Sequence, residues 1–173
     1  MIARGPTRWL GVVALLGALA GGCARARHDG DARWIADAER RHALADQQLQ
    51  AGNVAAAREA LLGIVDGRTP ADLPAGDRRG VLQDTYFRLA ELDLKAGDPR
   101  AALTDVQRGL GLGGADDLFV ANLLVVRGAA HEAMDDGAAA AADYHAALVI
   151  NDKLLAETLQ ESRDARPAPG ATP

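Results

Sequence analysis

Residues 86–112, with the sequence YFRLAELDLKAGDPRAALTDVQRGLGL, constrain the fold more than any other stretch of the chain. Apolar residues recur there at the spacing of one helical face, both before and after a Gly-Asp-Pro triplet. The two stripes consist of Tyr86, Leu89, Ala90 and Leu94, and of Ala102, Val106 and Leu110. The small residues Ala90 and Ala102 let two helices approach closely. The stretch therefore predicts a pair of antiparallel helices.

The triplet between the stripes has the chemistry of a helix end followed by a helix start. Gly97 suits the left-handed conformation that commonly ends a helix. Asp98 can cap the next helix, because its side chain accepts hydrogen bonds from the free N–H groups of the first turn. Pro99 stands at the first helical position, where its missing N–H costs nothing. We therefore expect a tight turn at Gly97.

Two further stretches match this one, 45 residues earlier and 38 residues later. The matched positions are Ala45 with Ala90 and Gly128, Gly52 with Gly97 and Asp135, Ala57 with Ala102 and Ala140, Leu61 with Val106 and Tyr144, and Val65 with Leu110 and Leu148. The expected helices of the first unit are 32–51, capped by Asp31, and 54–65, capped by Asn53. The third unit spans 117–150, and Gly137 is expected to supply its turn because Asp135 replaces the Gly.

This pattern resembles the tetratricopeptide repeat (TPR), in which a bulky residue, Leu, a small residue, Gly, Ala and an aliphatic residue recur at these intervals. The resemblance implies an all-α, right-handed superhelical solenoid of about three helix pairs. The stretch 151–163 is expected to form a seventh helix that caps the array, as terminal helices do in such solenoids. Insertions relative to the 34-residue repeat fall in two Gly-rich loops, 67–80 and 111–115.

The N-terminus has the composition of a targeting signal. Arg4 and Arg8 precede an apolar run, 9–22, that is too short at 1.5 Å per residue to span the bilayer's hydrocarbon core of about 30 Å. The run ends in Leu19-Ala20-Gly21-Gly22-Cys23, which resembles the lipobox of bacterial lipoproteins. In that family the Cys becomes the first mature residue and is acylated, and several acyl chains anchor a protein stably. The alternative is an ordinary secretory signal in which Cys23 has no role.

These features divide the chain into a lipoprotein signal peptide at 1–22, a lipidated tether at 23–31, a TPR-like helical domain at 32–163 and a disordered Pro-rich tail at 164–173. By resemblance to lipoprotein sorting in Gram-negative bacteria, Ala24 directs the protein to the outer membrane, facing the periplasm.

Composition narrows the classes of partner. Ala makes up about a fifth of the chain and aromatic residues 3%, which favours closely packed helices over sheets. The net charge is −5, and without residues 1–22, which hold Arg4 and Arg8 but no acid, it is −7. An acidic chain argues against nucleic acid and against a basic lipid-binding face. One Cys excludes an internal disulfide.

In TPR proteins the first helix of each pair lines a concave groove that binds peptide segments. The corresponding positions here predict a partner-binding face of His42, Asp46, Leu49, Asp84, Phe87, Glu91, Leu94, Val125 and Glu132, with Glu39, Asn122 and Ala129 beside them. These positions include acids but no Lys or Arg, with Phe87 as an apolar anchor. A basic and apolar protein segment would complement them.

Enzymatic chemistry finds little support in the sequence. His28, His42, His131 and His145 lack metal-ligand spacing, so no metal site is expected. Ser162 is the only Ser of the mature chain, and no Ser, Thr or Cys has the setting of an activated nucleophile. We therefore expect no catalytic residue and no cofactor apart from the lipid on Cys23. The expected function is that of a lipid-anchored adaptor for an envelope machine such as a pilus, secretion or outer-membrane assembly system. The alternatives are an enzymatic or solute-binding lipoprotein and a purely structural one.

Overall fold

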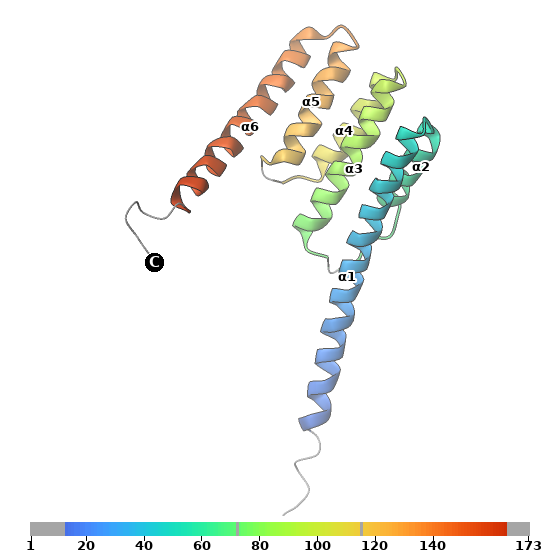
Figure 1. Cartoon of the computed structure of the whole chain (residues 1–173), viewed down its shortest axis with the longest axis vertical. Helices are drawn as coiled ribbons and strands as arrows, with labels where there is room; N and C mark the ends of the chain where they lie inside the picture. Colours follow the sequence, from blue (N-terminus) through green and yellow to red (C-terminus); the bar gives the residue numbers. More distant parts are fainter. Residues whose placement is uncertain (1–12, 72, 115, 166–173) are drawn as a thin grey trace, which may run out of the picture.

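The computed structural model of the protein describes residues 13–71, 73–114 and 116–165, with side chains from residue 30 onward in these ranges. Within them the chain forms six helices: α1 (Val13–Gln50), α2 (Val54–Val65), α3 (Ala75–Lys95), α4 (Pro99–Gly111), α5 (Leu118–Glu132) and α6 (Gly137–Asp164). The helices lie side by side in chain order and pack as three successive antiparallel pairs (Figure 1). The predicted all-α class and pairwise packing are confirmed.

The turns inside the three pairs share one geometry. A residue with positive φ ends the first helix of each pair: Gly52 and Gly97 at 79° and Asp135 at 62°. In each turn its N–H bonds to the carbonyl three residues back, and the following N–H bonds to the carbonyl five back. The expectation that Gly137 makes the third turn is wrong, because Asp135 adopts the left-handed conformation itself and Gly137 starts α6.

The predicted capping residues behave differently from one another. The side chain of Asp98 accepts a hydrogen bond from Ala101 N at 2.9 Å, as expected. Asp136 caps α6 in the same way, accepting from Ala139 N at 3.1 Å. Asn53 makes no such bond, contrary to expectation, because its amide donates to Gln48 Oε1 instead. Asp31 does not cap a helix either, since it lies inside α1.

Small residues stand where the helices approach most closely. The matched residues Ala45, Ala90 and Gly128, together with Ala57, Ala102 and Ala140, are all buried, as predicted. Around them, three apolar clusters follow one another along the array. The first joins α1, α2 and α3, the second joins α3, α4 and α5, and the third joins α5 and α6. Each pair is therefore packed on the next through a shared core.

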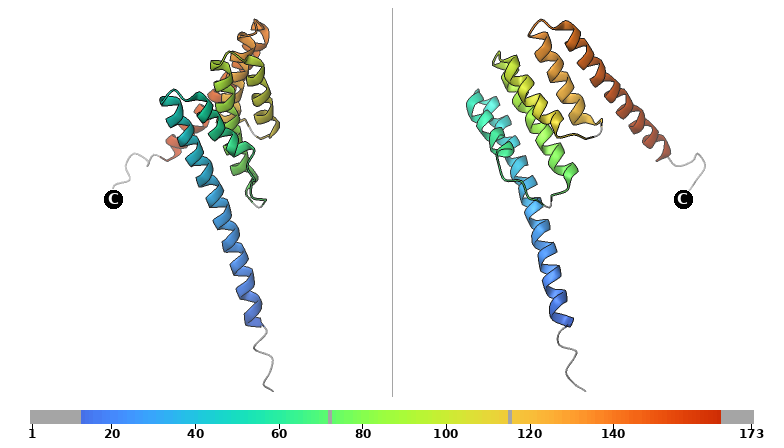
Figure 2. Two further views of the ribbon diagram at one scale, coloured as in Figure 1. Left: turned by 90° about the vertical axis from the view of Figure 1, so that its right-hand side faces the viewer. Right: turned by 180° about the vertical axis from the view of Figure 1, so that it is seen from behind.

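Two helices are longer than predicted. α1 begins at Val13, so residues 24–31 are helical where an irregular tether was expected, and the helix continues well beyond the others (Figure 2). Ala and Arg are strong helix formers, and a helix already begun propagates through one Gly at a cost of about 1 kcal/mol.

α6 is the second longer helix. It runs through residue 150 to Asp164, so the predicted seventh helix at 151–163 is a continuation of α6 rather than a separate element. No Gly or Pro stands between residues 138 and 164 to end it. α3 begins at Ala75, which shortens the expected 67–80 loop by more than a turn. Residues 1–12 of the expected signal peptide (1–22) and residues 166–173 of the expected tail (164–173) lie outside the described residues.

Candidate functional site

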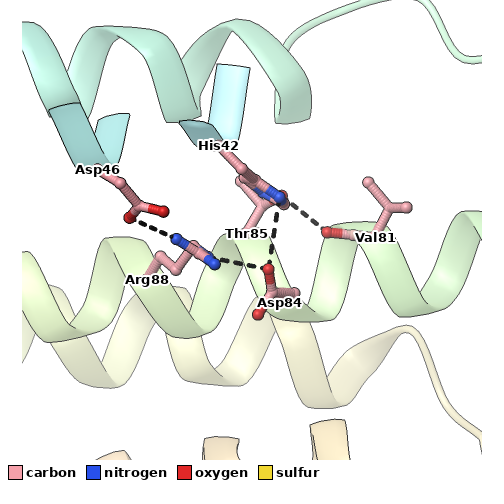
Figure 3. Close-up of polar contacts among 6 residues, drawn as sticks. All are labelled: His42, Asp46, Val81, Asp84, Thr85 and Arg88. Atoms are coloured by element: carbon pink, nitrogen blue, oxygen red, sulfur yellow. Dashed lines mark hydrogen bonds and ion pairs between the residues drawn. The ribbon is translucent and has the colours of Figure 1, made fainter. Parts of the chain in front are cut away.

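The predicted partner-binding face brings α1 and α3 together through polar side chains. His42 and Asp46 lie one turn apart on α1, and Asp84 and Arg88 lie one turn apart on α3 (Figure 3). We call these four residues, with Thr85, the α1/α3 junction. Thr85 is fully buried, and the other four side chains are partly exposed, from 15% for His42 to 52% for Asp46.

Arg88 is the central charge of the junction. Its Nη1 lies 2.8 Å from Asp46 Oδ1 and its Nε lies 2.9 Å from Asp84 Oδ2. Burial lowers the pKa of Arg88, but the two carboxylates outweigh that effect and raise it overall. The expectation that the acids of this face stand free of basic partners is therefore wrong. The pairing of Arg88 with Asp84 could have been predicted from the sequence, since the two residues have the i,i+4 spacing of a helical ion pair.

His42 lies beside this ion pair. Thr85 Oγ1 donates its proton to the carbonyl of Val81 at 2.7 Å, so it accepts from His42 Nε2 at 2.9 Å. The other ring nitrogen, Nδ1, is 3.5 Å from Asp84 Oδ2. Burial lowers the pKa of His42, with Arg88 acting in the same direction and Asp84 and Asp46 acting against it. The lowered pKa favours the neutral form of the ring. In the protonated form, Nδ1–H would face the carboxylate of Asp84.

The apolar residues of the predicted face are not free anchors. Leu49 packs against the first apolar cluster, and Phe87 and Leu94 pack against the second. Each is half-buried. Removal of the Phe87 ring would therefore weaken the core as well as any binding surface.

The remaining predicted residues lie at or near the surface. Glu91 is half-buried, Val125 is 43% exposed, and Glu132 is exposed and accepts a hydrogen bond from the Tyr144 hydroxyl at 2.8 Å. Cys23 lies within α1, where side chains are outside the described set, so its acylation stays a prediction.

Buried carboxylates form a second set of polar residues, which sequence reasoning missed. Asp105 on α4 lies 3.0 Å from Arg108 Nη1 and 4.0 Å from Arg58 Nη2, and Arg58 also bonds to Asp93. Burial raises the pKa of Asp105, and nearby Asp93 adds to that shift, although both arginines oppose it.

Asp143 on α6 is the counterpart of Asp105, 38 residues later. It is paired with Arg127 on α5, and His131 Nε2 lies 3.8 Å from it. The sequence signal was an acid within an apolar stripe, since Asp143 stands between Ala140 and Ala147. These pairs link helices through buried charge, where removing one partner is costly.

The surface has shallow hollows. One lies over α4, α5 and α6 and has Arg127, His131 and Asp143 in its wall. None of its lining residues is Ser, Thr or Cys, so its wall has no hydroxyl or thiol nucleophile. His131 faces Asp143, whereas His145 is exposed, so the two histidines do not form a joint site.

Within the described ranges the chain has neither a cluster of metal ligands nor a helix that could span a membrane. No group of three or more His, Cys, Asp or Glu side chains there is arranged to hold a metal ion. Nor does any described helix combine the length and apolar character needed to cross a membrane.

The fold and these contacts define an all-helical domain of six packed helices, joined in pairs by turns of one kind. The chain matches no protein-family model, and no curated protein shows significant sequence similarity to it.

Proposed function

We propose that this chain is a lipid-anchored adaptor of the bacterial cell envelope, built as a TPR-like right-handed solenoid, that binds a protein or peptide segment. The observation that carries the proposal is the threefold recurrence of one structural unit. Each unit has a positive-φ turn at the same place and a small residue at the same point on each of its two helices. Repeated helix pairs of this kind build extended surfaces whose usual role is protein binding.

The order of packing agrees with a solenoid. Each of the first helices α3 and α5 contacts both members of the preceding pair. Within the described residues, by contrast, the backbones of α2 and α4 are not in contact, nor are those of α4 and α6, although the long side chain of Arg58 reaches from α2 to Asp105 on α4. First helices therefore adjoin one another on one side of the array, and second helices stand apart on the other. This asymmetry is what curves a TPR array around a concave face.

The proposed partner surface is the α1, α3 and α5 side of the array. Arg88 neutralises part of Asp46 and Asp84, so the acids left to meet a partner are chiefly Glu39, Glu91 and Glu132. A segment that carries Lys or Arg beside apolar residues complements this surface. Charge at the rim of such an interface raises the association rate and sets orientation more than it adds affinity.

The anchor is tested first. Metabolic labelling with palmitate should mark the wild-type chain and not Cys23→Ser, and fractionation should place the labelled chain with the outer membrane. Labelling of the Cys23→Ser variant would show that Cys23 is not the residue that is acylated. A wild-type chain that is secreted without label would favour the ordinary signal peptide.

The adaptor function is tested by co-purification from native envelopes after mild crosslinking. The variant Glu39→Lys with Glu91→Lys reverses charge on α1 and α3, while Glu59→Lys with Glu157→Lys reverses two exposed charges on the second helices α2 and α6. We expect one envelope protein to be recovered with the wild type and the control pair and lost with the first pair. Equal recovery of the envelope protein with both double variants would show that the binding surface does not lie on the first helices.

A further inference from the structure

An apolar face is left open at the end of the array formed by α5 and α6. Its large exposed side chains are Leu118 (56% exposed) and Val125 (43%) on α5, and Tyr144 (37%), Leu148 (56%) and Leu155 (58%) on α6. Residues 118 and 125 are seven apart, and residues 144, 148 and 155 are four and seven apart. Both spacings place side chains on one face of a helix.

These residues lie along one surface. The ring of Tyr144 packs against the Cα of Gly128, and its hydroxyl reaches Glu132. Because α5 and α6 run antiparallel, one turn forward from Tyr144 to Leu148 corresponds to one turn back from Gly128 toward Val125 (Figure 1). By the same antiparallel register, Leu155, eleven residues after Tyr144, lies at about the level of Leu118, ten residues before Gly128. We call these five residues the end face.

The same surface is covered by a helix in the central pair. The 38-residue offset that relates the turns matches Val125 with Phe87, Tyr144 with Val106, and Leu148 with Leu110. All three central residues pack in or against the cluster that includes Leu123, Val126 and Ala130 of α5. In the last pair no helix of the described chain stands where α5 stands on the central one (Figure 1). The end face is therefore a helix-packing surface without its helix.

The opposite end of the array does not have this character. Tyr86 and Leu92 of α3 pack against the preceding pair, and their counterparts on α1, 45 residues earlier, are Arg41 and Gln47. Polar residues at these positions suit a helix that faces water. A second copy stacked head to tail would bring that polar helix onto the end face, which leaves the apolar residues without matching partners.

Charge also argues against two copies meeting through their end faces. Glu132 and Asp152 are exposed at the margin of the end face, with Asp152 between the turns of Leu148 and Leu155. Two such faces would set acids against acids, whereas a helix with Lys or Arg beside its apolar stripe would pair with them. His145 and Lys153 are also exposed on α6, and Asp116 is exposed just before α5.

We propose that the end face docks an amphipathic helix of another protein, with an apolar stripe at i, i+3, i+4 and i+7 and basic residues flanking it. The docked helix takes the place that α5 takes on the central pair. This inference rests on the proposed adaptor function, since it names a partner class and extends the first-helix side onto α6, with Val125 and Glu132 shared between the two surfaces.

The probe is a synthetic 18-residue helix, fluorescently labelled, with Leu at i, i+3, i+4 and i+7 and Lys at the flanking positions. A scrambled peptide of the same composition controls for charge alone. The full chain is held in nanodiscs of zwitterionic lipid, and empty nanodiscs serve as the blank. The variants are Leu148→Glu and Val125→Glu, with Leu44→Glu as the control because Leu44 is 44% exposed at the opposite end of the array.

We expect the wild type and Leu44→Glu to bind the amphipathic peptide at least tenfold tighter than the scrambled one, measured by fluorescence anisotropy. Leu148→Glu and Val125→Glu should each lose at least tenfold, and both sites are exposed enough for the variants to keep the wild-type thermal melt. Equal binding of the two peptides, or an equal loss in Leu44→Glu, would overturn the proposal. A wild-type dimer in sedimentation that Leu148→Glu dissociates would also overturn it, because the end face would then be covered by a second copy.

The co-purification experiment separates this inference from the proposed function. If the wild type recovers an envelope partner but binds the amphipathic and scrambled peptides equally, the adaptor function stands and the end-face proposal falls. If the peptide binds at the end face but no envelope protein co-purifies with the wild type, the end face stands and the adaptor function falls.

Discussion

The junction between α1 and α3 and the junction between α3 and α5 hold equivalent pairs of helices by different chemistry. The first uses His42, Thr85 and the Asp46–Arg88–Asp84 ion pairs, whose side chains are partly exposed. The second uses a buried apolar cluster that includes Ala90, Leu123, Val126 and Ala130, all at most 4% exposed. Figure 3 shows the polar contacts of the first junction.

The difference shows that equivalent positions in a repeated fold need not contribute equally to stability. Exposed ion pairs contribute about 0–1 kcal/mol each, whereas burying one Leu contributes about 1.5–3 kcal/mol. α1 is held mainly through α2, whose Ala57 and Leu61 pack with Leu89 and Leu92 of α3. The polar junction therefore sets the orientation of α1, and the apolar clusters supply the stability.

The largest effect is expected in the apolar junction. Leu123→Ala should lower the free energy of unfolding by about 2–5 kcal/mol, because Leu123 is fully buried and its loss leaves a cavity. Leu118→Ala, on the same helix but 56% exposed, is the matched control and should lie far below that range. Urea denaturation measures both. Similar values for the two variants would remove the distinction between the junctions.

Overpacking the same cluster should have the next largest effect. Ala102→Leu places a larger side chain between two helices at a residue with no exposed surface, and should cost about 1–3 kcal/mol. Ala138→Leu, an exposed position early in α6, should change stability by less than about 0.5 kcal/mol. Urea melts that give the two variants equal stability would show that the helices do not cross at Ala102.

The smallest effect is expected in the polar junction and appears as a pH dependence. Burial holds the pKa of His42 in the folded chain below its ordinary value of 6.5. As the pH falls below 6.5, His42 is protonated in the unfolded chain before it is protonated in the folded chain. The free energy of unfolding of the wild type therefore falls relative to that of His42→Gln, until the pH drops below the pKa of His42 in the folded chain. Thermal melts of both proteins from pH 7 to pH 5 measure the difference. A relative gain for the wild type at low pH would mean that the protonated ring pairs with Asp84 instead.

Local signals predicted the fold more successfully than the candidate site. The turn at Gly97, the cap at Asp98 and the small residues at Ala90 and Ala102 were readable because each depends on a few neighbouring residues. The ends of α1 and α6 were misjudged because a helix stops only where a breaker or a competing contact stops it. At the site, His42, Asp46 and Asp84 were named, but Arg88 was missed. Its pairing with Asp84 was readable from the i,i+4 spacing, whereas its reach across to Asp46 on α1 does not show in the spacing along one helix.

The amino-acid sequence alone was enough to establish the helix pairs and their turns, because the sign of φ, capping and apolar periodicity act within a few residues of one another. The folded chain alone revealed which charges meet, such as Arg88 with Asp46, 42 residues apart. It also revealed that Asp105 and Asp143 are buried and that the end face is open. These features depend on how each helix is rotated and shifted against its neighbours, and that placement is set by packing across the whole array.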